Sequence, residues 1–400
     1  MSFDWSNVFA SRARNMGASE IRELLKILEE PDVISFAGGI PDPDLFPLEA
    51  FQLAYGAALG AEAEAKRALQ YSVSEGAPEL RDWIAAYMTR LGAPCGRENI
   101  LVTNGSQQAL EFLGRLTISP NERALVTWPT YLGALQAFNA YEPAYDRLDP
   151  RGNAEPDAAG EGQPAKFAYV VPDFANPTGE TLTLAERRRV LDIASGAGAC
   201  VIEDGAYSEL RYEGEPLPPL IALDVAAKGD VNASNVIYCG TFSKTLSPGL
   251  RVGWIAAAET LIDKLVLVKQ ASDLHSSTLN QMAVARVAET AFSSQVDRVR
   301  KAYRTRRDAM LASLERHLPK GWRWSRPEGG MFVWVEGPEG VDGRALLERA
   351  VMQERVAFVP GQAFFADRSG SETMRLSFSL ADPEEIEEGV TRLARAIQAG

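Results

Sequence analysis

Short apolar runs, each followed by polar and glycine-containing residues, recur through the middle of the chain. Their length, their β-branched residues and their turn-forming flanks are typical of strands. Between them lie longer segments in which apolar residues recur every three or four positions, as they do in amphipathic helices. We therefore predict that strands and helices alternate from about residue 48. The predicted strands are Ile100–Thr103, Ala124–Thr127, Phe167–Val171, Ala199–Glu203 and Asn235–Cys239.

This alternation predicts an α/β fold with a mostly parallel sheet between two layers of helices. After about residue 295 the pattern changes, which indicates a smaller α+β domain. Its predicted elements are a charged helix at Val296–Leu318, strands at Gly330–Glu336 and Met374–Ser379, a helix at Arg344–Gln353, and a last helix capped by Asp382.

A chain of 400 residues is too long for one compact core, so we expect a large domain at 48–295 and a small domain at 296–400. In the N-terminal segment 1–47, Ser19 is placed to cap a helix whose apolar face includes Ile21 and Leu28. The segment Asp149–Lys166 is rich in Gly, Pro, Asp and Glu, which predicts an exposed connector.

Composition narrows the function. The net charge of −13 argues against a nucleic-acid partner, because phosphate-backbone affinity needs clustered Lys and Arg. The three cysteines are widely spaced, which disfavours disulfides or a zinc site and fits a cytoplasmic protein. With only two histidines, we expect no metal centre. Neither a secretory signal nor an apolar stretch of membrane-spanning length is seen, so no membrane association is predicted.

Residues able to carry chemistry stand just after the predicted strands or at the starts of the following helices. In sheets of this type, ligands bind beyond the carboxyl ends of the strands. Their shared position therefore predicts a single site. These residues are Gly105, Ser106, Tyr131, Asn176, Asp204, Tyr207 and Lys244.

Lys244 lies in the most informative segment, Cys239–Trp254. A lysine in a small polar loop can form a Schiff base with an aldehyde, and the hydroxyls of Thr241 and Ser243 together with Arg251 can hold a phosphate. Pyridoxal phosphate has both groups, and its enzymes need such a lysine and a carboxylate at the pyridine nitrogen. The alternative is a solvated surface lysine beside an unrelated arginine.

Asp204 ends a buried strand, where a carboxylate is costly unless it meets a cation or donors. A protonated pyridine nitrogen would supply the cation, although Asp204 could instead cap a following helix. Tyr207 and Asn176 could donate to the phenolic oxygen of the ring. The alternatives are ordinary packing for Tyr207 and a turn for Asn176, which precedes a proline.

Ser106 and Gln107 open a predicted helix, where free N–H groups favour an anion, although Ser106 could be a simple cap. Tyr131 could stack on the pyridine face or belong to the core. Arg375 alternates with apolar neighbours, and its planar fork suits the α-carboxylate of an amino acid. An internal salt bridge is the alternative for Arg375.

Taken together and in this order, these residues resemble the class I/II aminotransferases, which have the aspartate-aminotransferase fold. The specific motifs are Asn176–Gly179, Asp204 with Tyr207, and Ser243–Arg251. The resemblance covers nearly the whole chain. It implies a pyridoxal-phosphate enzyme that moves an amino group from an L-amino acid to a 2-keto acid through a Lys244 aldimine.

The N-terminal sequences Ile21–Leu25 and Ile34–Gly39 are most similar to the 2-aminoadipate/kynurenine aminotransferase and MocR-like branch. The resemblance implies that segment 1–47 joins the small domain, that Gly39 and Asn176 contact substrate, and that Arg22 lies at the side-chain end of the pocket. It also implies a homodimer in which Tyr71 reaches the cofactor phosphate of the partner subunit.

Two other activities share these motifs. The nearest is a lyase or decarboxylase of the same fold, which sequence discriminates poorly. The second is the ligand-sensing module of a MocR-type regulator, which carries a basic winged-helix region ahead of the pyridoxal-phosphate domain. Because the chain begins its own domain within about 20 residues, we favour the aminotransferase.

Overall fold

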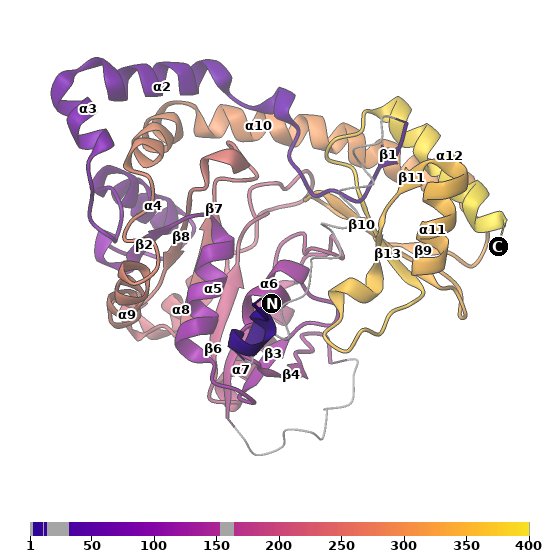
Figure 1. The fold of residues 1–400 in the computed structure, drawn as a ribbon, viewed down its shortest axis with the longest axis horizontal. Helices are drawn as coiled ribbons and strands as arrows, with labels where there is room; N and C mark the ends of the chain where they lie inside the picture. The colour runs from indigo at the N-terminus through magenta and orange to yellow at the C-terminus, as the bar shows by residue number, and fades with distance from the viewer. Residues whose placement is uncertain (1–2, 11, 14–31, 153–163, 400) are drawn as a thin grey trace.

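The structure is a computed structural model that describes residues 3–10, 12–13, 32–152 and 164–399. The helix predicted after Ser19 lies outside the described residues, as does the middle of the connector predicted at Asp149–Lys166. Figure 1 shows a large part built on a central sheet and a smaller part that contains the C-terminus, with the long helix α10 running along both.

The central sheet has seven strands in the order β2-β8-β7-β6-β5-β3-β4. Strand β8 is antiparallel to both of its neighbours, and the other pairs are parallel. The predicted mostly parallel sheet is thereby confirmed, whereas β4 and β8 were not predicted. The strands are β2 (Ile100–Thr103), β3 (Arg123–Val126), β4 (Ala144–Arg147), β5 (Ala165–Val170), β6 (Cys200–Asp204), β7 (Val236–Thr241) and β8 (Gly253–Ala256).

Helices cover both faces of this sheet, because each face contributes a separate set of buried apolar side chains. Helices α5 (Ser106–Thr117), α6 (Leu132–Asn139) and α9 (Glu259–Gln270) pack on one face. Helices α4 (Pro78–Arg90), α7 (Leu184–Gly196) and α8 (Leu220–Lys228) pack on the other.

The predicted alternation of strands and helices is wrong for residues 48–90. The regular elements in this range are all helices, namely α2 (Leu48–Gly60), α3 (Glu62–Leu69) and α4. The charged helix predicted at Val296–Leu318 is the second half of α10, which runs unbroken from Thr278 to His317. Because α10 crosses residue 295, the division into domains there stays a prediction.

The smaller sheet is antiparallel, in the order β12-β13-β10-β9. Asp382 caps the last helix as predicted, since its side chain accepts from the N–H groups of Glu384 and Glu385. The elements are β9 (Arg323–Trp324), β10 (Phe332–Glu336), α11 (Gly343–Glu354), β12 (Val359–Pro360), β13 (Thr373–Ser377) and α12 (Pro383–Gln398).

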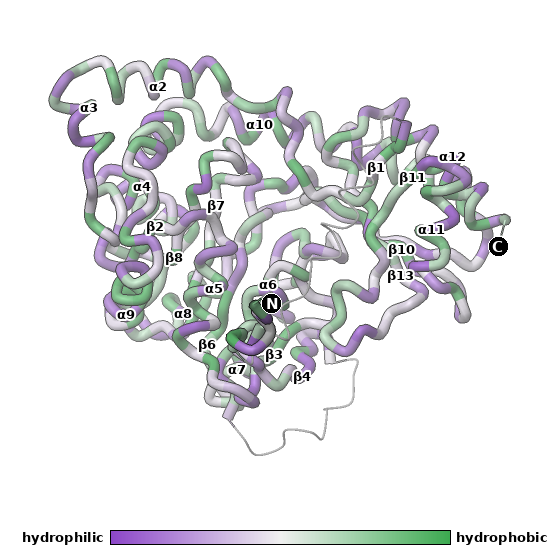
Figure 2. Tube along the Cα trace, in the orientation of Figure 1, coloured by the Kyte–Doolittle hydropathy of each residue, from purple (hydrophilic) through white to green (hydrophobic). Residues whose placement is uncertain are grey.

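Ile34 and Ser35 lie against this smaller part, because they form β1 (Ile34–Ser35), which pairs in parallel with β11 (Val356–Ala357). Short 3₁₀ helices occupy Trp5–Val8, Pro43–Leu45, Arg97–Asn99, Val231–Ala233, Pro248–Leu250 and Gly361–Phe364. Figure 2 shows hydrophilic and hydrophobic residues mixed along α12, as expected for a helix with one buried face. Within the described ranges, no helix is long and apolar enough to cross a membrane.

Candidate functional site

A cavity of about 140 Å³ lies at the carboxyl ends of β6 and β7 and at the start of α5. Nine of the residues predicted for the site line it, so most of them converge at the sheet edge. The predicted residues in its wall are Ser106, Gln107, Tyr131, Asp204, Tyr207, Thr241, Ser243, Lys244 and Arg251.

Asp204 is the last residue of β6 and is almost completely buried. Its carboxylate accepts hydrogen bonds from the Tyr169 hydroxyl (2.9 Å) and from the Ala206 N–H (3.1 Å). Burial raises the pKa of Asp204 to about 6, and these two hydrogen bonds oppose that rise. In the fully described stretch after it, the next α-helix starts only at Leu220, so Asp204 caps no α-helix.

Lys244 follows β7, and its Nζ donates a hydrogen bond to the Gly39 carbonyl at 3.1 Å. The pKa of Lys244 is lowered to about 8, chiefly by burial and also by the positive charges of Arg375 and Arg251, while Asp204 opposes the decrease. The ammonium group of Lys244 therefore loses its proton more readily than that of a solvent-exposed lysine.

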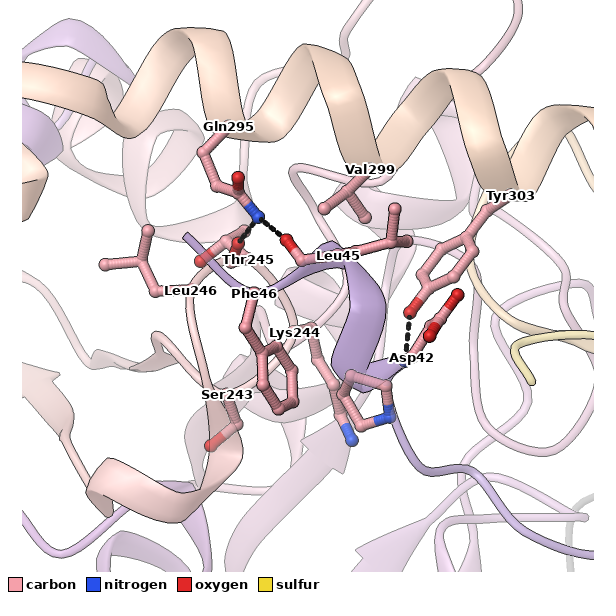
Figure 3. A pocket seen from close by; sticks show the side chains of 11 residues that line it. Asp42, Leu45, Phe46, Ser243, Lys244, Thr245, Leu246, Gln295, Val299 and Tyr303 are labelled. Carbon is pink, nitrogen blue, oxygen red and sulfur yellow. Dashed lines mark hydrogen bonds between the residues drawn. The ribbon is translucent and has the colours of Figure 1, made fainter. Parts of the chain in front are cut away.

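The N-terminal segment is held close to the lysine by α10. Figure 3 shows Gln295 of α10 directed at the backbone beside the lysine. The Gln295 Nε2 donates to the carbonyls of Leu45 (2.7 Å) and Thr245 (3.3 Å), and the Tyr303 hydroxyl accepts from the Asp42 N–H at 3.1 Å. These bonds fix the segment that carries the Gly39 carbonyl.

Arg251 has a left-handed backbone (φ 55°), and its guanidinium donates to the carbonyls of Pro248 (3.2 Å) and Asn104 (3.0 Å). Gly105 (φ 79°) passes so close that a Cβ there would lie 2.5 Å from the guanidinium. Ser106, the next residue, is the first of α5, and the free N–H groups at the start of a helix favour an anion. A cation and a helix start are thus brought together.

Two buried residues with hydroxyl groups, Thr241 and Ser243, line the same cavity as this cation and the lysine. The Thr241 hydroxyl donates to the Ser243 Oγ at 2.9 Å and accepts from the Ser243 N–H at 3.1 Å. On the far side of the cavity, Gln107 Nε2 donates to the Gly133 carbonyl at 2.7 Å. Tyr131 directly precedes α6, and burial raises its pKa to about 12, so its hydroxyl stays protonated.

Arg375 on β13 is buried and contacts two aromatic rings, with its Cζ 4.3 Å from the ring centre of Phe332 and 5.1 Å from that of Phe364. Its guanidinium donates to Asn176 Oδ1 (2.9 Å) and to the Ala37 carbonyl (2.6 Å), and its buried Nε has no hydrogen-bond partner. Both partners are uncharged, so the guanidinium keeps its charge for an anion. These contacts are not the internal salt bridge that was the predicted alternative for Arg375.

Asn176 links this arginine to Tyr207, because its Oδ1 accepts from Arg375 and its Nδ2 donates to the Tyr207 hydroxyl at 3.4 Å. Tyr71 lies elsewhere: it is 79% exposed and makes an edge contact with the His275 ring at 5.9 Å. Arg22 lies outside the described residues. The chain therefore places Tyr71 outside its own cavity.

Comparison with known proteins identifies the family. The model for class I and II aminotransferases matches residues 32–393. The chain belongs to this family. It is 43% identical to aromatic-amino-acid aminotransferase 1 of Thermococcus litoralis, covering 99% of this chain and 95% of that protein. It is 42% identical to the 2-aminoadipate transaminase of Thermus thermophilus, covering 98% and 97%.

Solved structures agree with the sequences. An α-aminoadipate aminotransferase from Thermus thermophilus, complexed with N-(5′-phosphopyridoxyl)-L-leucine, matches with a TM-score of 0.89 and 41% identity over 99% of both chains. A multiple-substrate aminotransferase from Thermococcus profundus matches with a TM-score of 0.90 and 40% identity over 99% of both chains. The protein is thus a pyridoxal-phosphate-dependent enzyme that transfers amino groups.

The side chains of this aminotransferase fit the cofactor. Asp204 is a buried carboxylate whose two partners are neutral donors, so a cationic ring nitrogen would complete its surroundings. Arg251 and the start of α5 supply the donors that a phosphate needs. The unpartnered Nε of Arg375 points to a further acceptor at the substrate end.

Sequence reasoning missed the side chains that support these groups. Tyr169 lies in an apolar strand and carries no local sign that its hydroxyl meets Asp204. Phe332 and Phe364, which enclose Arg375, come from β10 and a distant 3₁₀ helix. Only the pairing of β10 with β13 brings the first of them near the arginine, so no short motif could have revealed it.

Proposed function

We propose that amino transfer takes place in this cavity, with Lys244 as the residue that holds the cofactor and moves the proton. One observation carries the proposal. Lys244, a buried lysine with a pKa lowered to about 8, shares a cavity with the buried carboxylate of Asp204. The guanidinium of Arg251 in the same cavity can bind an anion. Each of the three groups matches a different part of pyridoxal phosphate.

When bound, pyridoxal phosphate supplies an aldehyde that takes up amino groups and a ring that withdraws electrons from the neighbouring carbon. Asp204 keeps a proton on the ring nitrogen, while Tyr131 covers the face of the ring. The phosphate is bound by Ser106, Ser243 and Arg251. Gln107 and Thr241 line the cavity beside it and are fixed by their own hydrogen bonds. Lys244 Nζ, once free, takes the proton from the substrate Cα.

Substrate is held from the opposite side. The forked guanidinium of Arg375 binds the α-carboxylate, which donors and acceptors share. Asn176 donates toward the ring oxygen together with the Tyr207 hydroxyl, to which it is already bonded. The Gly39 carbonyl, which now accepts from Lys244, closes the substrate side.

Reduction of the purified protein with borohydride tests the assignment of the lysine. The reagent fixes the cofactor on the residue that holds it, and peptide mass spectrometry then identifies that residue. We expect the adduct on Lys244. An adduct on any other lysine would overturn the assignment.

We further propose a homodimer in which Tyr71 completes the cavity of the partner subunit. The exposure of Tyr71 supports this role. Apolar side chains near it are also exposed, with exposed fractions of 77% for Leu53, 73% for Leu69 and 53% for Val73. A solution mass of two chains in light scattering would support the dimer.

Mixing two inactive variants tests the crossing directly. When Tyr71→Ala and Lys244→Ala chains are unfolded and refolded together, the mixed dimer contains one site with both lesions and one intact site. Activity should therefore return if Tyr71 acts across the interface. If Tyr71 acts within its own chain, both sites of the mixed dimer carry a lesion and activity stays low.

We propose that donors include L-2-aminoadipate, aromatic amino acids and leucine. The proposal draws on the names of the similar proteins and on the leucine adduct of the solved relative. A donor panel with 2-oxoglutarate, scored by the keto acid formed with and without the acceptor, tests both donor range and transfer.

We place the protein in the cytoplasm, which the three unpaired cysteines support.

A further inference from the structure

A buried polar network lies behind the start of α5, outside the lining of the cavity. Its centre is Lys269 of α9, whose side chain is completely covered. The Lys269 Nζ donates to both carboxylate oxygens of Asp273 (3.1 and 3.0 Å) and to the Ser276 Oγ (3.0 Å). A buried ammonium group is costly unless it is paired in this way.

The network extends to the loop between β2 and α5. The Asp273 carboxylate accepts from Asn104 Nδ2 (2.6 Å) and from Gln108 Nε2 (2.8 Å). Gln108 Oε1 in turn accepts from the Asn104 N–H (2.8 Å) and from Lys269 Nζ (3.1 Å). Both the backbone and the side chain of Asn104 are therefore tied to one ion pair, in which Lys269 is buried and Asp273 is partly buried.

Asn104 connects this pair with the proposed phosphate site. Its carbonyl accepts from the Arg251 guanidinium at 3.0 Å, and the next residue along the chain, Gly105, passes within close contact of the same group. The helix start at Ser106 follows immediately. A shift of Asn104 would thus move the cation and the free N–H groups together.

We propose that Lys269 and Asp273 are positioning residues that fix the phosphate-binding end of the cavity through Asn104. The inference rests on the proposed function, since it takes Arg251 and the start of α5 as the phosphate site. A buried ion pair is often no more stable than apolar side chains of similar volume. The Lys269–Asp273 pair instead serves to hold Asn104 in one fixed position.

The test compares two ligands that differ only in the phosphate. The full-length protein, freed of cofactor, is titrated by calorimetry with pyridoxamine 5′-phosphate and with pyridoxamine. Neither has an aldehyde, so the chemistry of Lys244 does not enter. The variants are Lys269→Met, which breaks the pair, and Asn104→Ala, which leaves the pair whole and removes only the hydrogen bond from the Asn104 side chain to Asp273. Lys264→Met, at an exposed position of the same helix, is the matched control.

We expect each test variant to bind pyridoxamine 5′-phosphate about tenfold more weakly than the wild type and pyridoxamine less than about twofold more weakly. The difference arises because only the contacts to the phosphate are misplaced. The control should match the wild type for both ligands. Asn104→Ala keeps the test decisive if Lys269→Met does not fold.

Three results would overturn the inference, and they are distinguishable. Unchanged preference for the phosphorylated ligand in Asn104→Ala would show that the network does not act on the phosphate site. Equal weakening of both ligands would show a general structural role. If the wild type itself binds the two ligands equally, the proposed phosphate site is wrong, and the inference falls with it.

Discussion

Replacing Asp204 by Asn should have opposite effects on the empty and the loaded protein. The carboxylate is buried beside neutral donors, and its pKa is raised from 3.8 to about 6. At about 1.4 kcal/mol per pH unit, the ionised group destabilises the cofactor-free protein by about 3 kcal/mol. Asparagine removes this penalty but hydrogen-bonds less well to Tyr169, at a cost of roughly 1 kcal/mol.

The cofactor-free Asp204→Asn protein should therefore be more stable by about 2 kcal/mol in urea unfolding at neutral and higher pH. The sign of the pH dependence follows from the raised pKa. The native protein binds more protons than the unfolded chain between the two pKa values, so the wild type gains stability as the pH falls. The advantage of the variant should shrink between about pH 6 and about pH 4.

Cofactor should reverse the effect. In the wild type the carboxylate gains a cationic partner, so pyridoxal phosphate should raise the thermal midpoint more than in Asp204→Asn. Turnover of the variant should fall by orders of magnitude, because each ~1.4 kcal/mol of lost transition-state stabilisation is tenfold in rate. Asp192→Asn, at an exposed position on α7, is the control. A cofactor-free Asp204→Asn protein less stable than the wild type at every pH would refute the reasoning.

Further changes probe the other groups. Lys244→Ala should keep weak cofactor binding, seen by absorbance, and lose turnover. In the wild type, the rate at which cofactor-free protein takes up pyridoxal phosphate should rise as the pH passes through about 8, because the neutral amine is the nucleophile; a rate independent of pH there in stopped-flow absorbance would contradict the lowered pKa. Arg375→Lys should raise the KM of all donors and acceptors together, since the charge stays and the fork is lost. Arg22→Ala should impair glutamate and 2-aminoadipate while sparing leucine and aromatic donors, and an unchanged donor preference would remove Arg22 from the pocket.

Sequence patterns located several strand ends, but they missed β4, β8 and the first half of α10. Strand ends could be predicted because an apolar run must stop where polar residues begin, and Asp204 and Lys244 stand at such ends. β8 was missed because it follows the lysine motif closely and runs antiparallel, outside the strand–helix repeat. The first half of α10 was missed because its buried residues include Gln281 and Thr278, so its apolar pattern is broken.

Long-range support could not be predicted from local patterns. The Tyr169 hydroxyl meets Asp204 only because β5 and β6 are paired in a particular register, with Tyr169 opposite Ile202. Lys269 gave no local signal either, since a lysine on an amphipathic helix is expected in solvent. In both cases the decisive fact is which distant residue lies opposite, and that is settled by packing rather than by sequence spacing.

The charges of the cavity fit the two roles that we propose for Lys244, as a nucleophile toward the cofactor and as a base toward the substrate. Burial lowers the pKa of Lys244, and Arg375 and Arg251 both lower it further. A phosphate at Arg251 and a carboxylate at Arg375 would each cancel one of these repulsions. We therefore expect the amine to become more basic once both anions are bound, when it must take a proton from carbon. The empty cavity favours a neutral, nucleophilic amine, whereas the filled cavity favours a stronger base.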